Sequence, residues 1–173
     1  MDVKTERDST PPKHRTTAER ASGRELVTTR TFDAPPRLVF EAWTRPELLR
    51  QWWAPRSLGM SLLSCEADVR VGGRYRLVFE GHGGSPPMAF FGQYLEVVPP
   101  SRLVWTNEEG GDEGPVTTVT FEARGGQTLL VLRELYPSRE VLDAAIASGS
   151  TAGMDESFAQ LDEFLLTLAP GRS

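Results

Sequence analysis

The sequence predicts an α+β fold in which an antiparallel sheet of six to seven strands curves around one long C-terminal helix. Alternating runs rich in β-branched and aromatic residues, separated by glycine and proline turns, occupy most of the chain between residues 24 and 135. A helical pattern of apolar residues follows at 151–168. Because helices interrupt the strands only once, after the first strand, consecutive strands are expected to pair antiparallel.

The chain begins with a polar segment. Residues 1–22 contain mostly Thr, Ser, Pro and charged residues, too little apolar surface to offset the entropy of ordering. We therefore expect a flexible tail over 1–22 and a single domain over 23–170. The first strand is predicted at 24–32, and the prolines that follow it end the strand.

Two short helices are predicted next, the first with apolar residues at helical spacing up to Trp43 and the second over 47–53. In the run RYRLVFE, Tyr75, Leu77 and Phe79 share one strand face. Paired glycines at 72–73 and 125–126 predict hairpin turns. The remaining predicted strands are 61–71, 74–80, 88–98, 102–106, 116–123 and 128–135.

Helical patterns close the chain, first over 138–146 and then over 151–168. The second carries a continuous apolar stripe that predicts packing on the sheet. Its acidic pairs, Asp155-Glu156 and Asp162-Glu163, are interpreted as solvent-facing charges. The stripe comprises Met154, Phe158, Leu161, Leu165 and Leu168.

Composition excludes several classes of function. A net charge of −5 and a pI near 5.2 provide no basic stripe for a nucleic acid or an anionic membrane surface. No apolar run is long enough to cross a bilayer and the N-terminus lacks a signal-peptide pattern, so a cytoplasmic location is expected. The single cysteine, Cys65, excludes an intramolecular disulfide, and with only two histidines, His14 and His82, no metal site is expected. No cofactor motif is present.

Several motifs, in order, resemble the Activator of Hsp90 ATPase homologue 1-like family of the START-like superfamily. They cover about residues 24–168, and it is their order and spacing that make the similarity specific. They are FDAPPRLVFEAWTRPELLRQWWAP (32–55), VGGRYRLVF (71–79), FFGQYLEVVPPSRLVWT (90–106), the hairpin sequence at 116–138, and SGSTAGMDESFAQLDEFLL (148–166).

The resemblance implies a helix-grip fold, also called START-like or Bet v 1-like, with a cavity between sheet and C-terminal helix that takes hydrophobic molecules. Family members share no catalytic residue set, so the resemblance implies no active site. The eukaryotic co-chaperone that names the family carries an additional N-terminal domain, where this chain has a short polar tail. An Hsp90-like partner is therefore not expected.

Aromatic and polar strand residues are the candidates for contact with a ligand. Three tryptophans lie close together in sequence, and they either clamp the short helices over the sheet or form the mouth of the cavity. Arg133 and Glu134 are neighbours on a strand, so at most one of them points inward. The cavity candidates are Trp43, Trp52, Trp53, Tyr75, Arg76, Phe79, Phe91, Tyr94, Trp105, Glu134, Met154, Phe158 and Leu161.

Three functions remain open from sequence. The leading one is binding of a small hydrophobic molecule without catalysis. A polyketide cyclase or aromatase would need a positioned acid or base in the cavity, with Glu134, Arg76 and Tyr94 as candidates. A chaperone-associated stress-response role is suggested only by the family name. An exposed tryptophan-rich loop and an edge strand also predict a homodimer.

Overall fold

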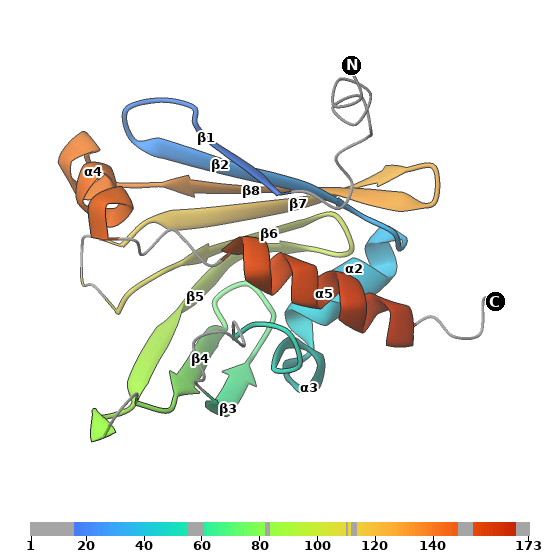
Figure 1. Cartoon of the computed structure of the whole chain (residues 1–173), viewed down its shortest axis with the longest axis horizontal. Coiled ribbons are helices and arrows are strands. Elements are labelled where there is room, and N and C mark those ends of the chain that lie inside the picture. Colours follow the sequence, from blue (N-terminus) through green and yellow to red (C-terminus); the bar gives the residue numbers. More distant parts are fainter. Residues whose placement is uncertain are drawn as a thin grey trace, which may run out of the picture.

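A computed structural model describes residues 16–54, 61–81, 84–109, 111, 114–148 and 154–168. Its eight strands form one antiparallel sheet in the order β1-β2-β8-β7-β6-β5-β4-β3, and the helices lie beside it (Figure 1). The α+β architecture predicted from sequence is confirmed, with one strand more than expected. The strands are β1 (Thr17–Arg20), β2 (Glu25–Phe32), β3 (Leu62–Ala67), β4 (Arg74–Phe79), β5 (Met88–Val98), β6 (Arg102–Thr106), β7 (Val116–Arg124) and β8 (Gln127–Leu135).

The additional strand corrects the expected flexible tail. Residues 17–20 form β1, which pairs antiparallel with β2 in the register Thr17↔Thr29 to Arg20↔Leu26. All four β1 residues are exposed, so backbone hydrogen bonds rather than apolar burial hold this edge strand. Residues 1–15 of the expected tail lie outside the described residues.

The sheet bends along β5, its longest strand. The register shifts between Tyr94 and Glu96 where β5 meets β6, which marks a bulge. Gly92 lies just before it, where an added Cβ would come within 2.0 Å of the Thr106 carbonyl oxygen. Bulges and close backbone approaches increase strand curvature. This bend turns β3, β4 and the first part of β5 toward the helices.

Four helices are described: α2 (Pro36–Thr44), α3 (Pro46–Leu49), α4 (Arg139–Ser148) and α5 (Met154–Leu168). In Figure 1, α5 lies across the sheet next to α2, while α4 lies beyond the other end of the sheet. Two buried polar side chains fix α5 to the loop after α3. Ser157 Oγ donates to the Trp53 carbonyl at 2.8 Å, and Gln160 Nε2 donates to the carbonyls of Trp52 and Ala54, both at 2.9 Å.

The main core fills the space between α2, α5 and the central strands. Phe32 of β2 and Phe158 of α5 are both fully buried and meet edge to face, with ring centroids 5.5 Å apart. Leu161 and Leu165 extend the same buried face of α5. The apolar stripe predicted for the C-terminal helix is therefore the face that packs on the sheet.

A buried ion pair adds a polar connection between sheet and helix. Arg30 of β2 is only 4% exposed, and its Nη2 lies 2.7 Å from Oδ2 of Asp162 on α5. Its Nη1 contacts Asp155 at 3.5 Å and donates to the hydroxyl of Thr16 at 2.8 Å. The interpretation of Asp162 as a solvent-facing charge is thus wrong, whereas Asp155 is 79% exposed.

Candidate ligand-binding cavity

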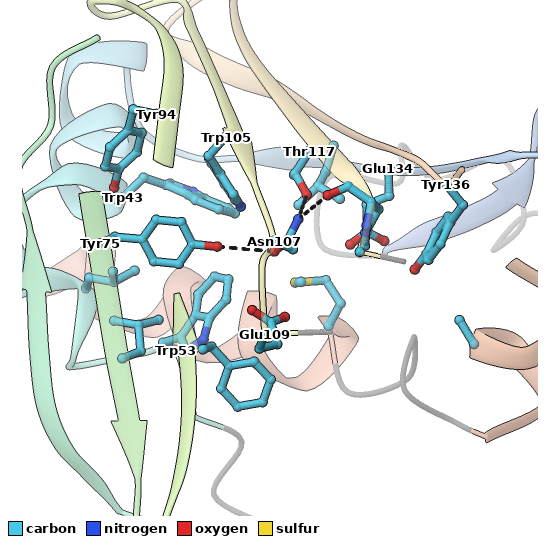
Figure 2. A pocket seen from close by; sticks show the side chains of 18 of the residues that line it. Trp43, Trp53, Tyr75, Tyr94, Trp105, Asn107, Glu109, Thr117, Glu134 and Tyr136 are labelled. Atoms are coloured by element: carbon cyan, nitrogen blue, oxygen red, sulfur yellow. Dashed lines mark hydrogen bonds between the residues drawn. The ribbon is translucent and has the colours of Figure 1, made fainter. Parts of the chain in front are cut away.

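A cavity of about 630 Å³ lies between the concave face of the sheet and the helices (Figure 2). All strands from β4 to β8 contribute to its wall, as do α2, α3 and α4 and the first residue of α5. The described lining residues are Trp43, Leu49, Trp53, Tyr75, Leu77, Phe79, Phe90, Tyr94, Trp105, Asn107, Glu109, Gly114, Pro115, Thr117, Leu132, Glu134, Tyr136, Val141, Ala144, Ala145 and Met154.

Strand alternation determines which residues reach the cavity. On β4 the odd-numbered residues Tyr75, Leu77 and Phe79 line it, and the register pairs Tyr75 with Gly92 of β5. On β8 the even-numbered residues Leu132 and Glu134 line it. Because successive strand residues point to opposite faces, their immediate strand neighbours lie on the far side of the sheet.

Aromatic rings form one half of the cavity wall. Trp43 of α2 lies with its ring centroid 5.7 Å from that of Trp53 and 5.9 Å from that of Trp105 of β6. Tyr75 and Tyr94 follow, with centroids 5.8 Å apart. Burial raises the pKa of both phenols well above the ordinary value. These groups therefore stay neutral, and the rings present an uncharged apolar surface.

Polar groups gather at the other end of the cavity, where Figure 2 places Asn107, Thr117, Glu134 and Tyr136, while Glu109 is drawn beside Trp53. Asn107 is fully engaged: its Nδ2 donates to the Pro115 carbonyl and to Thr117 Oγ1, both at 2.8 Å. The Tyr75 hydroxyl donates to the Thr106 carbonyl at 2.7 Å and lies 3.3 Å from Asn107 Oδ1. This network fixes the loop after β6 against β7.

Glu134 stands apart from that network. Among the described residues, its carboxyl has no hydrogen-bond or ion-pair partner, and burial raises its pKa from 4.5 to about 7. Burial, with the Glu134 charge as the smaller cause, also raises the pKa of the neighbouring Tyr136 to about 12. Because the folded state holds the Glu134 proton more tightly than the unfolded state, ionising this carboxyl costs folding free energy as the pH rises from about 4.5 to about 7.

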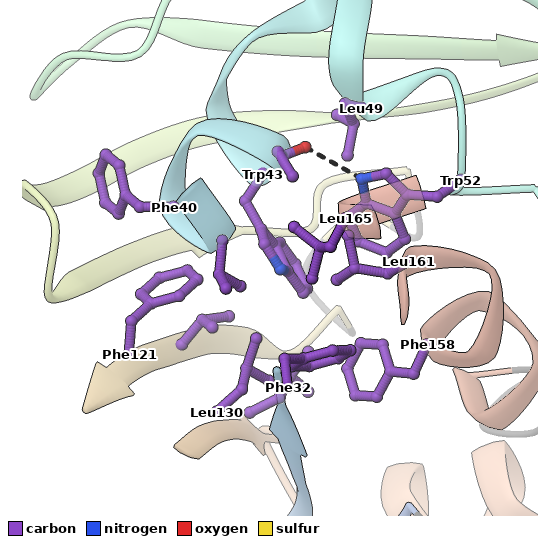
Figure 3. Packing of buried hydrophobic residues seen from close by; sticks show 14 of the residues in the cluster. Phe32, Phe40, Trp43, Leu49, Trp52, Phe121, Leu130, Phe158, Leu161 and Leu165 are labelled. Carbon is purple, nitrogen blue, oxygen red and sulfur yellow. Dashed lines mark hydrogen bonds between the residues drawn. The ribbon is translucent and has the colours of Figure 1, made fainter. Parts of the chain in front are cut away.

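The structure brings eight of the thirteen sequence-derived candidates onto the cavity wall. Three others, Trp52, Phe158 and Leu161, belong to the core (Figure 3). Trp52 is fully buried and its Nε1 donates to the Ala42 carbonyl at 3.0 Å, so it clamps the short helices. The eight on the wall are Trp43, Trp53, Tyr75, Phe79, Tyr94, Trp105, Glu134 and Met154.

Arg76 and Phe91 need correction, because alternation places both on the strand face opposite the cavity. Arg76 is exposed, between the lining residues Tyr75 and Leu77. Phe90, not Phe91, is the β5 phenylalanine at the cavity, where its ring meets that of Phe79 at 5.4 Å. Even with the inward-facing residues of β4 known, the sequence does not tell which residues of β5 face the cavity, because that depends on the pairing register of the two strands.

Sequence reasoning missed the part of the wall that comes from loops and from α4. Asn107 and Glu109 follow β6, between the predicted strands 102–106 and 116–123, where the sequence predicted neither a helix nor a strand. Val141, Ala144 and Ala145 share one face of α4, the helix at the polar end. The sequence predicted α4 from its helical pattern, but this pattern does not show which face of the helix lines the cavity.

A reactive thiol, a metal site and a membrane-spanning helix are three further features to consider. The Cys65 thiol packs against the main core, and burial raises its pKa to about 11, so it is protonated at neutral pH. Within the described ranges, no group of three metal-ligating side chains occurs. His14 and His82 lie outside those ranges. None of the described helices has the length and apolar character needed to span a bilayer.

The bent antiparallel sheet, the C-terminal helix packed on it and the cavity beside that helix define a helix-grip protein. A family model, Activator of Hsp90 ATPase homolog 1-like protein, matches residues 33–165. The chain therefore belongs to this family, as its motifs predicted. No curated protein matches the chain.

Solved structures share the fold over nearly the whole chain. A protein from Rhodobacter sphaeroides is 27% identical, with a TM-score of 0.80, over 88% of this chain and 99% of its own. A protein from Chromobacterium violaceum is 30% identical, with a TM-score of 0.64, over 80% of this chain and 95% of its own. At 23% identity, a protein from Nitrosomonas europaea has a TM-score of 0.76 over 87% of this chain and 98% of its own.

Proposed function

We propose that this protein binds a small, mostly apolar molecule in the cavity between its sheet and its helices. The observation that carries the proposal is the aromatic-walled space of about 630 Å³. Ligand sites commonly occupy a few hundred to about 1,000 Å³ and combine apolar walls with a few polar groups. The space is half open and far larger than the voids of a well-packed interior, so it offers a ligand both room and access.

Binding accounts for the arrangement of the wall. The rings of Trp43, Trp53 and Trp105 give a ligand a large apolar contact area, and burying that area drives association. The polar end then fixes the orientation of the ligand through one or two hydrogen bonds. We also retain the proposal of a homodimer, which light scattering can test.

A bulky residue at the rim of the cavity should block binding. Ala144 is exposed on α4 and lines the cavity, so Ala144→Trp places an indole in the ligand's space at little cost in stability. We expect the affinity for a neutral probe, 2-naphthylmethanol, to fall at least about tenfold, which corresponds to about 1.4 kcal/mol. Isothermal titration calorimetry measures this directly.

Ala147→Trp is the matched control, because Ala147 is exposed on the same helix but is not part of the wall. Its affinity for the probe should equal that of the unmodified protein. Equal affinities for all three proteins would mean that the probe binds elsewhere. A probe that shows no saturable binding to the unmodified protein would argue against the proposed cavity function.

Catalysis in the same cavity is a second candidate, favoured by one observation. A carboxyl with a pKa of about 7, such as that of Glu134, can accept and return a proton near neutral pH. Arg76 is not part of the cavity wall, and the raised pKa of the Tyr94 phenol keeps that phenol neutral. Neither residue therefore supplies a charged partner group for Glu134.

The name of the family refers to activation of Hsp90. No feature of the described residues adds support for that function.

A further inference from the structure

The charged side chains in the described part of the cavity wall are all acidic. Among the described lining residues none is Lys, Arg or His, whereas Glu109 and Glu134 are both acidic. Glu109 lies exposed at the edge, where its Oε1 accepts a hydrogen bond from the Phe91 amide at 3.2 Å. Ionised carboxylates in a space with low-dielectric walls create a negative potential that favours cations.

Among the described residues, the surroundings of Glu134 supply no counter-charge. Its strand partners are Thr117 of β7 and Leu26 of β2. Tyr136 is its titratable neighbour at this end of the cavity, and the described lining residues of α4 are all apolar. A half-buried carboxylate without a donor or a cation is partly desolvated, which costs free energy. Its position on the wall leaves the missing partner to be supplied from inside the cavity.

The aromatic half of the wall suits the same class of ligand. Tryptophan and tyrosine rings offer a large, rigid apolar surface for the body of such a ligand. Trp43, Trp53, Tyr75, Tyr94 and Trp105 are all part of this wall. An apolar body with one ammonium group matches both halves, because the rings contact the body and the carboxylate binds the charge.

We propose that the cavity binds a hydrophobic organic cation, such as an amine on an aromatic or alicyclic body, whose ammonium group pairs with Glu134. This inference rests on the proposed binding function and narrows it to one ligand class. It also disfavours fatty acids and other carboxylates, because their charge would lie next to Glu134 with no basic side chain among the described lining residues.

Three naphthalene probes that differ mainly in charge test the proposal: 2-naphthylmethylamine, 2-naphthylmethanol and 2-naphthoate. By calorimetry at a pH of about 8, we expect the amine to bind at least about tenfold more tightly than the alcohol, as for a hydrogen bond to a charged group. The naphthoate should bind most weakly. Glu134→Gln should bring the ratio of amine to alcohol affinity close to one, whereas Glu80→Gln, at an exposed glutamate outside the wall, should preserve it.

The pH dependence provides a second readout. The pKa of Glu134 is about 7, and the amine probe stays largely protonated between about pH 5.5 and 8.5 because the pKa of a primary amine is well above 7. Amine affinity should therefore increase over this range as Glu134 ionises, and this increase should vanish in Glu134→Gln. Alcohol binding with no preference for the amine, or tighter binding of the naphthoate, would overturn the inference and leave the proposed function standing. Binding of none of the three would overturn both.

Discussion

Replacing Phe158 with alanine is expected to lower the free energy of unfolding by about 3–5 kcal/mol. Phe158 is fully buried on α5 and packs edge to face on Phe32 of β2. Its removal loses apolar burial and leaves a void where helix and sheet meet. Urea unfolding followed by tryptophan fluorescence measures the loss.

Met154→Ala provides the matched control on the same helix. Met154 is partly buried and lines the cavity, so part of its side chain already borders unfilled space. We expect its removal to cost much less, about 1 kcal/mol. Equal losses at the two positions would mean that Phe158 and Met154 do not differ in packing, contrary to a filled core at one and a cavity at the other.

Asp162→Ala should also cost about 3–5 kcal/mol, because it leaves a buried guanidinium without its closest anion. The Arg30 Nη2 to Asp162 Oδ2 distance is 2.7 Å, and the Asp162 side chain is only 16% exposed. Thermal or urea unfolding of the single variant measures the loss. Asp155→Ala removes the longer, exposed contact to the same arginine and should cost less than about 1 kcal/mol.

A double variant separates the charge effect from packing. Replacing both members of a buried pair by apolar residues removes the uncompensated charge. Arg30→Met combined with Asp162→Leu should therefore be more stable than Asp162→Ala alone. If Asp162→Ala were no more destabilising than Asp155→Ala, the ion pair would not hold α5 on β2.

The alternation of apolar residues and the glycine pairs predicted the strands well, because both are visible within a short stretch of sequence. Tyr75, Leu77 and Phe79 share the inner face of β4, as their spacing predicted. The polar strand β1 carries no apolar alternation, so its sequence resembles a tail. Its formation depends on the free edge of β2, which no local pattern reveals.

The charged residues were harder to place than the apolar ones. That Arg133 and Glu134 point to opposite faces follows from strand geometry, but which one faces inward depends on how the sheet curves. The structure exposes Arg133 and turns Glu134 to the cavity. The pairing of Arg30 with Asp162 joins residues 132 positions apart, so it could not be recognised without the fold.

The tryptophan cluster shows why both sequence interpretations held in part. Trp52 clamps the short helices through its bond to the Ala42 carbonyl, whereas Trp43 and Trp53 line the cavity. Adjacent positions thus serve different purposes, since the turn after α3 sends Trp52 inward to the core and Trp53 to the cavity. Sequence distance alone does not distinguish them.

The indole N–H signals of the four tryptophans report most directly on whether the cavity is occupied. In a titration of nitrogen-15-labelled protein with 2-naphthylmethanol, the signals of Trp43, Trp53 and Trp105 should shift and saturate with one dissociation constant. Trp52, which lies in the core, should shift least. Signals that do not saturate, or a largest shift at Trp52, would contradict the account of this cavity as a binding site.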